Sequence, residues 1–358
     1  MRWREESGLW TTGPEPELPP LTAVLEVCGA VLSWTVDDVV GRPQIVLTDL
    51  DRADWLWRVV GGAGHDALVS ALLDATGADV DVPDVTVTPE AVAGLRRLAL
   101  GHWLRRWWPA SRRDGIADLD AALLDGELAV LTAAAHEFFD DDTFDADVAG
   151  LLQPHVGHWE SLVGHHDPRV AEIARAGVEL AEDSGVPVVA ASPRRRDDYA
   201  LAAAGPVGES GGDVAIARGR SSVRWSAVPP GIFDAAEDTI DWAVRAGDGQ
   251  VSAVVTTDVW GARSPAGIAV RIRAGDVDGS GTLDPAGGAT VALFDGAAAT
   301  SEDTAWGHDW STATVLLGPD VAETRQARDR ARAFARRRLS EPGADAYLAE
   351  IVAAEGDY

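Results

Sequence analysis

The sequence contains no lysine and no asparagine, so all 30 of its basic residues are arginines. Without lysine there is no anchor for a Schiff base or pyridoxal phosphate, no P-loop lysine and no protein-kinase lysine. Without asparagine there is no acceptor for N-glycosylation. Both residues have AT-rich codons, so their absence indicates a bacterial genome rich in GC. Several enzyme classes are therefore excluded before any motif is considered.

Cysteine is nearly absent as well, because Cys28 is the only one. A single cysteine excludes an intrachain disulfide and a cysteine-based zinc site. The first residues, MRWREESGLW, show no signal-peptide pattern. The apolar run 21–34 is short and carries Glu26, which is not the pattern of a membrane span. These features predict a cytoplasmic protein without a transmembrane segment.

Positively charged residues are also few relative to negatively charged ones, since the formal net charge is −28. Proteins that bind nucleic acids normally present a basic face, because contacts to phosphates supply much of the affinity. Anionic membranes attract basic segments for the same reason. The charge therefore argues against DNA, RNA or an anionic membrane as the main partner, and it leaves another protein.

The 358 residues, 46% of them hydrophobic, are enough for one large domain or two ordinary ones. Residues 21–34 read as one buried helix or strand, and Asp167–Glu182 reads as a helix capped by Asp167. Farther along, Ile268, Val270 and Ile272 alternate with polar residues, as strands do. We predict an α+β chain, divided as follows: a flexible tail at 1–20, a Trp-rich and mainly helical domain at 21–186, a linker or long loop at 187–213, an antiparallel β-sandwich-like domain at 214–318, and C-terminal helices at 319–358.

The most regular element is the stretch from Thr88 to Trp108. Thr88 suits an N-cap, Pro89 suits the first helical position, and apolar residues follow at helical spacing. One interpretation is a core helix whose arginines pair with acidic neighbours. The other is a docking face for an acidic partner or a membrane surface. Its candidate partner-binding residues are Arg96, Arg97, Trp103, Arg105, Arg106, Trp107 and Trp108.

Two short strings resemble the motifs of a serine protease. Ala129–His136 (AVLTAAAH) and Gly208–Gly212 (GESGG) look like the histidine and serine motifs of chymotrypsin-like proteases. In that mechanism His136 would be the general base and Ser210 the nucleophile. However, His136 lies in a helical pattern where that fold needs strands, so a Gly-rich linker is the preferred interpretation of Gly208–Gly212.

Four histidines form a second candidate site. They are close in sequence, and histidines three apart on a helix share a face that could bind zinc. The spacing fits no standard zinc motif, so loop or cap histidines are the alternative. The candidate zinc ligands are His155, His158, His165 and His166.

The string DVDGSGTLD resembles the first nine positions of a calcium-binding loop. Gly287 occupies the twelfth position, where a bidentate glutamate is expected, and the flanking residues look like strands. An acidic hairpin is the alternative. The candidate calcium ligands are Asp276, Asp278, Ser280 and Asp284.

No motif assembles a coherent active site, and 14 tryptophans are available as interface anchors. We therefore predict a non-catalytic protein–protein interaction protein, an adaptor or accessory subunit of a larger bacterial cytoplasmic assembly, with no cofactor. The first alternative is a metal-dependent or serine hydrolase. The second is a calcium-binding module. The two alternatives would require Zn²⁺ or another metal, or Ca²⁺.

Overall fold

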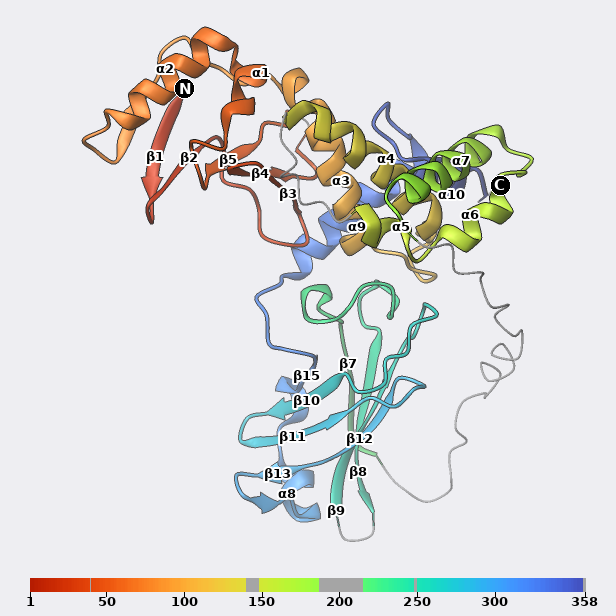
Figure 1. Cartoon of the computed structure of the whole chain (residues 1–358). Coiled ribbons are helices and arrows are strands. Elements are labelled where there is room, and N and C mark those ends of the chain that lie inside the picture. The colour runs from red at the N-terminus through yellow and green to blue at the C-terminus, as the bar shows by residue number, and fades with distance from the viewer. Residues whose placement is uncertain (39, 140–147, 187–214, 248–249, 357–358) are drawn as a thin grey trace. The chain divides into compact units, whose positions relative to one another are not determined.

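A computed structural model describes residues 1–38, 40–139, 148–186, 215–247 and 250–356 (Figure 1). Helices and antiparallel sheets are both present, so the predicted α+β class is confirmed. The chain forms two compact units. Unit 1 comprises 1–108, 119–191 and 325–358, and unit 2 comprises 109–118 and 192–324. Among the helices of the described ranges, none combines the length and apolar character that a membrane crossing requires.

Unit 1 begins as a six-stranded antiparallel sheet in the order β3-β4-β5-β2-β1-β6. In β3, Ala23, Leu25 and Val27 face the core, whereas Val24 and Glu26 are exposed. This alternation is typical of a sheet with one buried face. The strands are β1 (Arg2–Glu6), β2 (Leu9–Thr12), β3 (Thr22–Val27), β4 (Ala30–Thr35), β5 (Gln44–Leu47) and β6 (Asp79–Asp81).

This sheet differs from the flexible tail and the mainly helical domain that the sequence predicts. Ser7 and Gly8 have positive φ angles of 55° and 84°, which form the tight turn between β1 and β2. Trp3, only 1% exposed, anchors β1 in the core. The predicted element at 21–34 is two strands, because Cys28 and Gly29 turn the chain between Val27 and Ala30.

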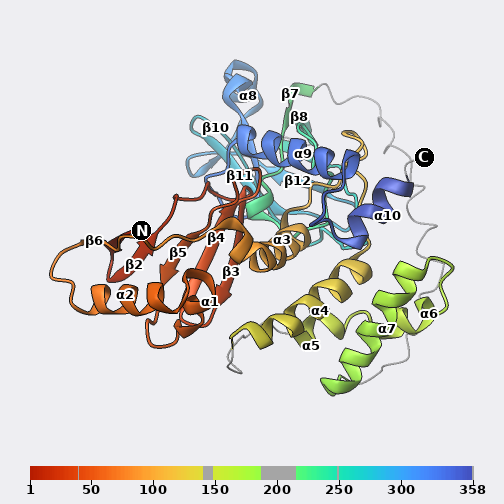
Figure 2. The same cartoon turned by 90° about the horizontal axis from the view of Figure 1, so that it is seen from above.

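Helices complete unit 1. Figure 2 shows α3 beside β3, and the two elements are in contact. α7 begins as predicted: Asp167 accepts a hydrogen bond from the Arg169 backbone N–H (2.8 Å), and Pro168 is the first helical residue. The helices are α1 (Trp57–Val60), α2 (Gly62–Leu73), α3 (Ala93–Trp107), α4 (Ala121–Phe139), α5 (Val148–Leu152), α6 (Val156–Leu162), α7 (Pro168–Asp183), α9 (Arg325–Ser340) and α10 (Leu348–Gly356).

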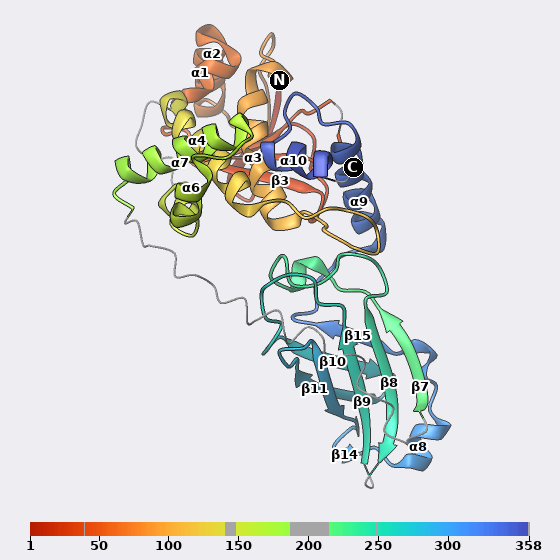
Figure 3. The same cartoon turned by 90° about the vertical axis from the view of Figure 1, so that its right-hand side faces the viewer.

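Unit 2 contains two antiparallel sheets, in the orders β12-β9-β8-β7 and β14-β13-β11-β10-β15 (Figure 3). β10 shows the predicted alternation, since Val270 and Ile272 are buried between exposed neighbours. The elements are β7 (Ala215–Ser221), β8 (Ile240–Gly247), β9 (Gln250–Thr257), β10 (Ala269–Ala274), β11 (Val277–Thr282), β12 (Gly288–Ala292), β13 (Phe294–Asp295), β14 (Ala298–Ala299), α8 (Glu302–Gly307) and β15 (Thr314–Leu317).

The loop 109–118 belongs to unit 2, although the sequence predicts it within the helical domain. Asp234 is 5% exposed and holds this loop. Its carboxylate accepts hydrogen bonds from the Ser111 hydroxyl (2.6 Å) and from the Arg112 backbone N–H (2.9 Å). A carboxylate satisfied in this way fixes an irregular segment that has no strand of its own. The predicted linker 187–213 lies outside the described residues.

Replacing two glycines of α3 by alanine should change the stability of unit 1 in opposite directions. A Cβ on Gly101 would lie 2.3 Å from the Tyr347 hydroxyl and 2.6 Å from Leu128, whereas a Cβ on Gly94 would meet nothing. Gly101→Ala should therefore destabilise unit 1 by about 1–3 kcal/mol. Gly94→Ala should stabilise it by up to about 1 kcal/mol. Urea unfolding followed by circular dichroism at the helix band measures both, and equal effects would mean that α3 is not packed as described.

Candidate functional site

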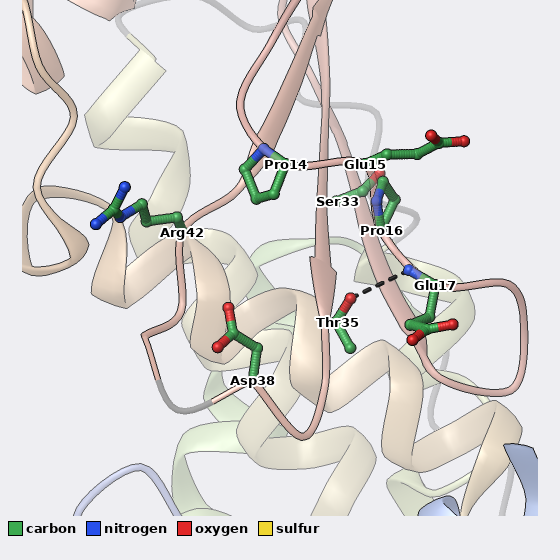
Figure 4. A pocket seen from close by; sticks show the side chains of 8 residues that line it. All are labelled: Pro14, Glu15, Pro16, Glu17, Ser33, Thr35, Asp38 and Arg42. Carbon is green, nitrogen blue, oxygen red and sulfur yellow. Dashed lines mark hydrogen bonds between the residues drawn. The ribbon is translucent and has the colours of Figure 1, made fainter.

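A pocket of about 330 Å³ lies in unit 1, on the N-terminal sheet (Figure 4). It combines carboxylates, hydroxyls, proline rings and one guanidinium group. Its lining residues come from the segment after β2, from β4, and from the connection between β4 and β5. They are Pro14, Glu15, Pro16, Glu17, Ser33, Thr35, Asp38 and Arg42.

The alternation of β4 places the two hydroxyls in the pocket. Leu32 and Trp34 are buried on the core face of β4, so Ser33 and Thr35 point to the opposite face. The Pro14–Glu17 segment lies over that face, where the Glu17 backbone N–H donates to the Thr35 hydroxyl oxygen (3.1 Å). The strand therefore forms the floor of the pocket, and the proline-rich segment forms its wall.

One arginine of α9 neutralises part of the acidic rim. Arg330 donates two hydrogen bonds to Asp37 and one to Glu17, each of 2.8 Å. These hydrogen bonds raise the pKa of Arg330, so it stays charged at any ordinary pH. Glu17 and Asp37 are consequently already satisfied within unit 1.

Two carboxylates of the pocket have no ion pair among the described residues. Within the part of the chain that the structure describes, Glu15 has no hydrogen bond or ion pair. The Asp38 carboxylate accepts one hydrogen bond, from the backbone N–H of Val40 (3.0 Å), and no cationic side chain pairs with that carboxylate there, although Arg96 donates to the backbone carbonyl of Asp38 (3.3 Å). Both groups are therefore available to a ligand that carries positive charge.

Ser33 is the most unusual residue of the pocket. It is only 8% exposed, and no described residue forms a hydrogen bond with its hydroxyl group. Its hydroxyl oxygen is not among the described polar atoms that are both fully buried and without a partner, so it is accessible from the pocket. A polar group of a ligand seated in the pocket could bind this oxygen in place of water.

The predicted docking helix, α3, is largely internal. Trp103 is 2% exposed and donates to the Pro20 carbonyl (2.6 Å). Arg97 pairs with Glu127 (2.5 Å), and Arg105 pairs with Asp125 (2.5 Å). These contacts match the core-helix interpretation, in which the arginines pair with acidic neighbours.

The other four candidates, on α3 and at its C-terminal end, are each partly exposed. Arg96 donates to the Asp38 carbonyl (3.3 Å), beside the pocket. The Arg106 guanidinium lies 4.2 Å from the centre of the Trp107 ring. Trp107 and Trp108 are half-buried. A partner-binding role for these four residues stays a prediction.

The structure does not bring the four candidate zinc ligands together. His155 bonds to Asp125 (3.0 Å), and the rings of His165 and His166 stack with centroids 4.2 Å apart. Nowhere in the described ranges do three histidine, cysteine, aspartate or glutamate residues gather as metal ligands do. His158 lies on α6, where its backbone carbonyl accepts from Ser161 (2.6 Å). His155 is thus a cap histidine and His165 and His166 are loop histidines, as the alternative predicts, whereas His158 lies within a helix.

The structure describes only one residue of the serine pair, and it does not form the candidate calcium loop. His136 lies on α4, and Ser210 lies outside the described residues. Asp278 and Ser280 lie on the extended strand β11, which Asp276 precedes, so the segment does not curl into a cation-binding loop. Asp284 accepts hydrogen bonds from the backbone N–H groups of Ala286 and Gly288 (2.8 and 2.9 Å). These bonds close a turn, which matches the acidic-hairpin alternative.

His102, on α3, gives unit 1 a predictable pH dependence. Burial, and then the charge of Arg105, lower the pKa of His102 below its ordinary value of 6.5, although Asp125 raises it. As the pH falls below 6.5, the unfolded chain binds a proton that the folded chain resists. The free energy of unfolding should therefore decrease as the pH falls below 6.5. His102→Gln should reduce this slope in urea titrations, and an unchanged slope would contradict the assignment.

Comparisons of the chain with protein-family models, with curated proteins and with solved structures each found no match. The geometry of the pocket is therefore the basis for inferring a function.

Proposed function

We propose that this chain is a non-catalytic protein–protein interaction protein, an adaptor or accessory subunit of a larger bacterial assembly, and that the unit 1 pocket receives a side chain of its partner. The observation that carries the proposal is a pocket in which the Ser33 hydroxyl has no hydrogen-bond partner, and the carboxylates of Glu15 and Asp38 have no ion pair, among the described residues. A site built to bind polar groups is stabilised when a ligand completes its hydrogen bonds.

The surroundings of the pocket support a macromolecular partner. Leu18 directly follows the proline-rich wall and is 70% exposed, and Val40 lies between Asp38 and Arg42 and is 52% exposed. Apolar side chains beside a polar pocket suit an interface, in which flanking contacts exclude water from the central group. A small ligand would leave both side chains in water.

Position-specific crosslinking tests this proposal. A photo-crosslinking amino acid in place of Leu18 should capture one protein from a bacterial lysate. The same amino acid in place of Leu73 is a matched control, since Leu73 is 71% exposed and lies on α2, outside the pocket lining. Ser33→Leu, which fills the pocket, should abolish the capture at position 18. Its unfolding midpoint shows whether the variant is folded.

Equal capture from positions 18 and 73, or capture that survives in a folded Ser33→Leu variant, would contradict the proposal. The hydrolase and calcium-binding alternatives, the cytoplasmic location and a sandwich arrangement of the unit 2 sheets stay predictions. No contact among the described residues favours either alternative activity over partner binding.

A further inference from the structure

We infer that the partner's side chain is an arginine, bound by Glu15, Asp38 and the Ser33 hydroxyl. This inference rests on the proposed function, because it names the residue that the pocket receives.

The negative charge of the pocket favours a cationic side chain. Of the carboxylates in and beside the pocket, Glu17 and Asp37 are paired with Arg330. Glu15 and Asp38 have no ion pair within the described ranges. A ligand with positive charge would neutralise both, and the net charge of −28 would attract it over a longer range.

The contact of Arg330 with the rim of the pocket favours a guanidinium group. Its Nε and one terminal nitrogen bind the two oxygens of Asp37, while the other terminal nitrogen binds Glu17. A guanidinium has five N–H donors in a planar fork that matches carboxylates in this way. The rim of the pocket thus already binds one guanidinium between two carboxylates, and the remaining carboxylates could bind a second.

The hydrogen-bond acceptors of the pocket also favour arginine over other side chains. A guanidinium offers only donors, and Ser33 provides a hydroxyl oxygen that can accept. The five donors of a guanidinium can be divided among Glu15, Asp38 and Ser33, whereas a lysine ammonium has three donors and is more strongly hydrated. A neutral side chain would satisfy the hydroxyl and leave the carboxylates uncompensated.

The shape and size of the pocket fit one arginine side chain. Pro14 and Pro16 line the pocket with apolar rings, which suit the aliphatic part of an arginine side chain. A volume of about 330 Å³ is at the lower end for ligand pockets, which fits one long side chain and not a folded element. Two arginines oppose a cation: Arg42, an exposed lining residue, and Arg96, which donates to the Asp38 carbonyl beside the pocket (3.3 Å).

The test uses the full chain and three blocked tripeptides: acetyl-Gly-Arg-Gly-amide and its lysine and citrulline counterparts. Citrulline has nearly the shape of arginine without its charge. Nuclear magnetic resonance titrations should show shifts at Ser33 and Thr35 with the arginine peptide, weaker shifts with lysine and none with citrulline. Glu15→Gln and Asp38→Asn should each weaken binding about fivefold, as expected for partly exposed charge pairs. Arg42→Gln should strengthen it.

Asp295→Asn on β13 of unit 2 is the control, since it makes the same charge change outside the pocket and should leave binding unchanged. If the crosslink at position 18 is specific but the arginine and citrulline peptides behave alike, the inference fails and the proposed function stands. If that crosslink is also absent, both fail. Equal weakening by Asp295→Asn would mean that only net charge matters, which also overturns the inference.

Discussion

Replacing Glu350 by alanine should destabilise unit 1 by about 3–5 kcal/mol, the largest effect that we expect from a single charge removal. Glu350 is fully buried on α10. It accepts two hydrogen bonds from Arg338 of α9 (2.5 and 2.7 Å) and one from the Tyr347 backbone N–H (2.9 Å). Without the carboxylate, a nearly buried guanidinium would lose its main partner.

The same pair predicts the behaviour of two other variants. Arg338→Met combined with Glu350→Leu should recover most of the lost stability, because removing both charges leaves neither uncompensated. Glu355→Ala is the matched control on the same helix, since its pair with Arg169 is exposed (2.7 Å), and it should have little effect. Urea unfolding followed by circular dichroism measures all three variants. A small loss for Glu350→Ala would contradict the buried pair.

Replacing Trp103 by alanine should destabilise unit 1 by a similar amount, about 3–5 kcal/mol. Trp103 is 2% exposed and packs edge-on against Phe334 of α9, with ring centroids 5.3 Å apart. Its indole N–H donates to the Pro20 carbonyl, beside the proline-rich segment. Alanine would leave a cavity and an unpaired carbonyl at the same place.

Trp57→Ala is the control for this prediction, because Trp57 is 43% exposed and its removal should cost much less. The comparison also separates the two interpretations of α3. A large loss of stability for Trp103→Ala supports a core helix. Normal stability combined with loss of partner capture would support a docking helix and contradict the packing described above.

Local signals in the sequence predicted the elements that depend on local chemistry. Asp167 and Pro168 predicted the start of α7, and the alternation around Val270 and Ile272 predicted β10. Both features act over a few residues, through capping and through the two-residue period of a strand.

The N-terminal sheet was missed because its signals are short or ambiguous. Arg2–Glu6 is mostly charged, and only the buried Trp3 reveals that it is a strand. Residues 21–34 carry a long apolar run in which a helix and a hairpin look alike. The alternation of Leu32, Ser33 and Trp34 was the one local clue that a hydroxyl group lies on the face opposite the core.

The pocket could not be predicted from the sequence, because its parts meet only through tertiary contacts. The Pro14–Glu17 segment reads as a tail by composition. Arg330, which neutralises part of the rim, is separated from Asp37 by 293 residues. Pairings between residues so far apart in the sequence depend on the packing of α9 within unit 1. Local periodicity does not specify that packing.

Competition for the crosslink at position 18 tests the central claim most directly, because it joins the partner, the pocket and the arginine in one measurement. Acetyl-Gly-Arg-Gly-amide at saturating concentration should suppress the crosslink between position 18 and the partner protein, while the citrulline peptide should leave the yield unchanged. A crosslink that is specific to position 18 but is unaffected by the arginine peptide would contradict the claim that the pocket holds an arginine of the partner.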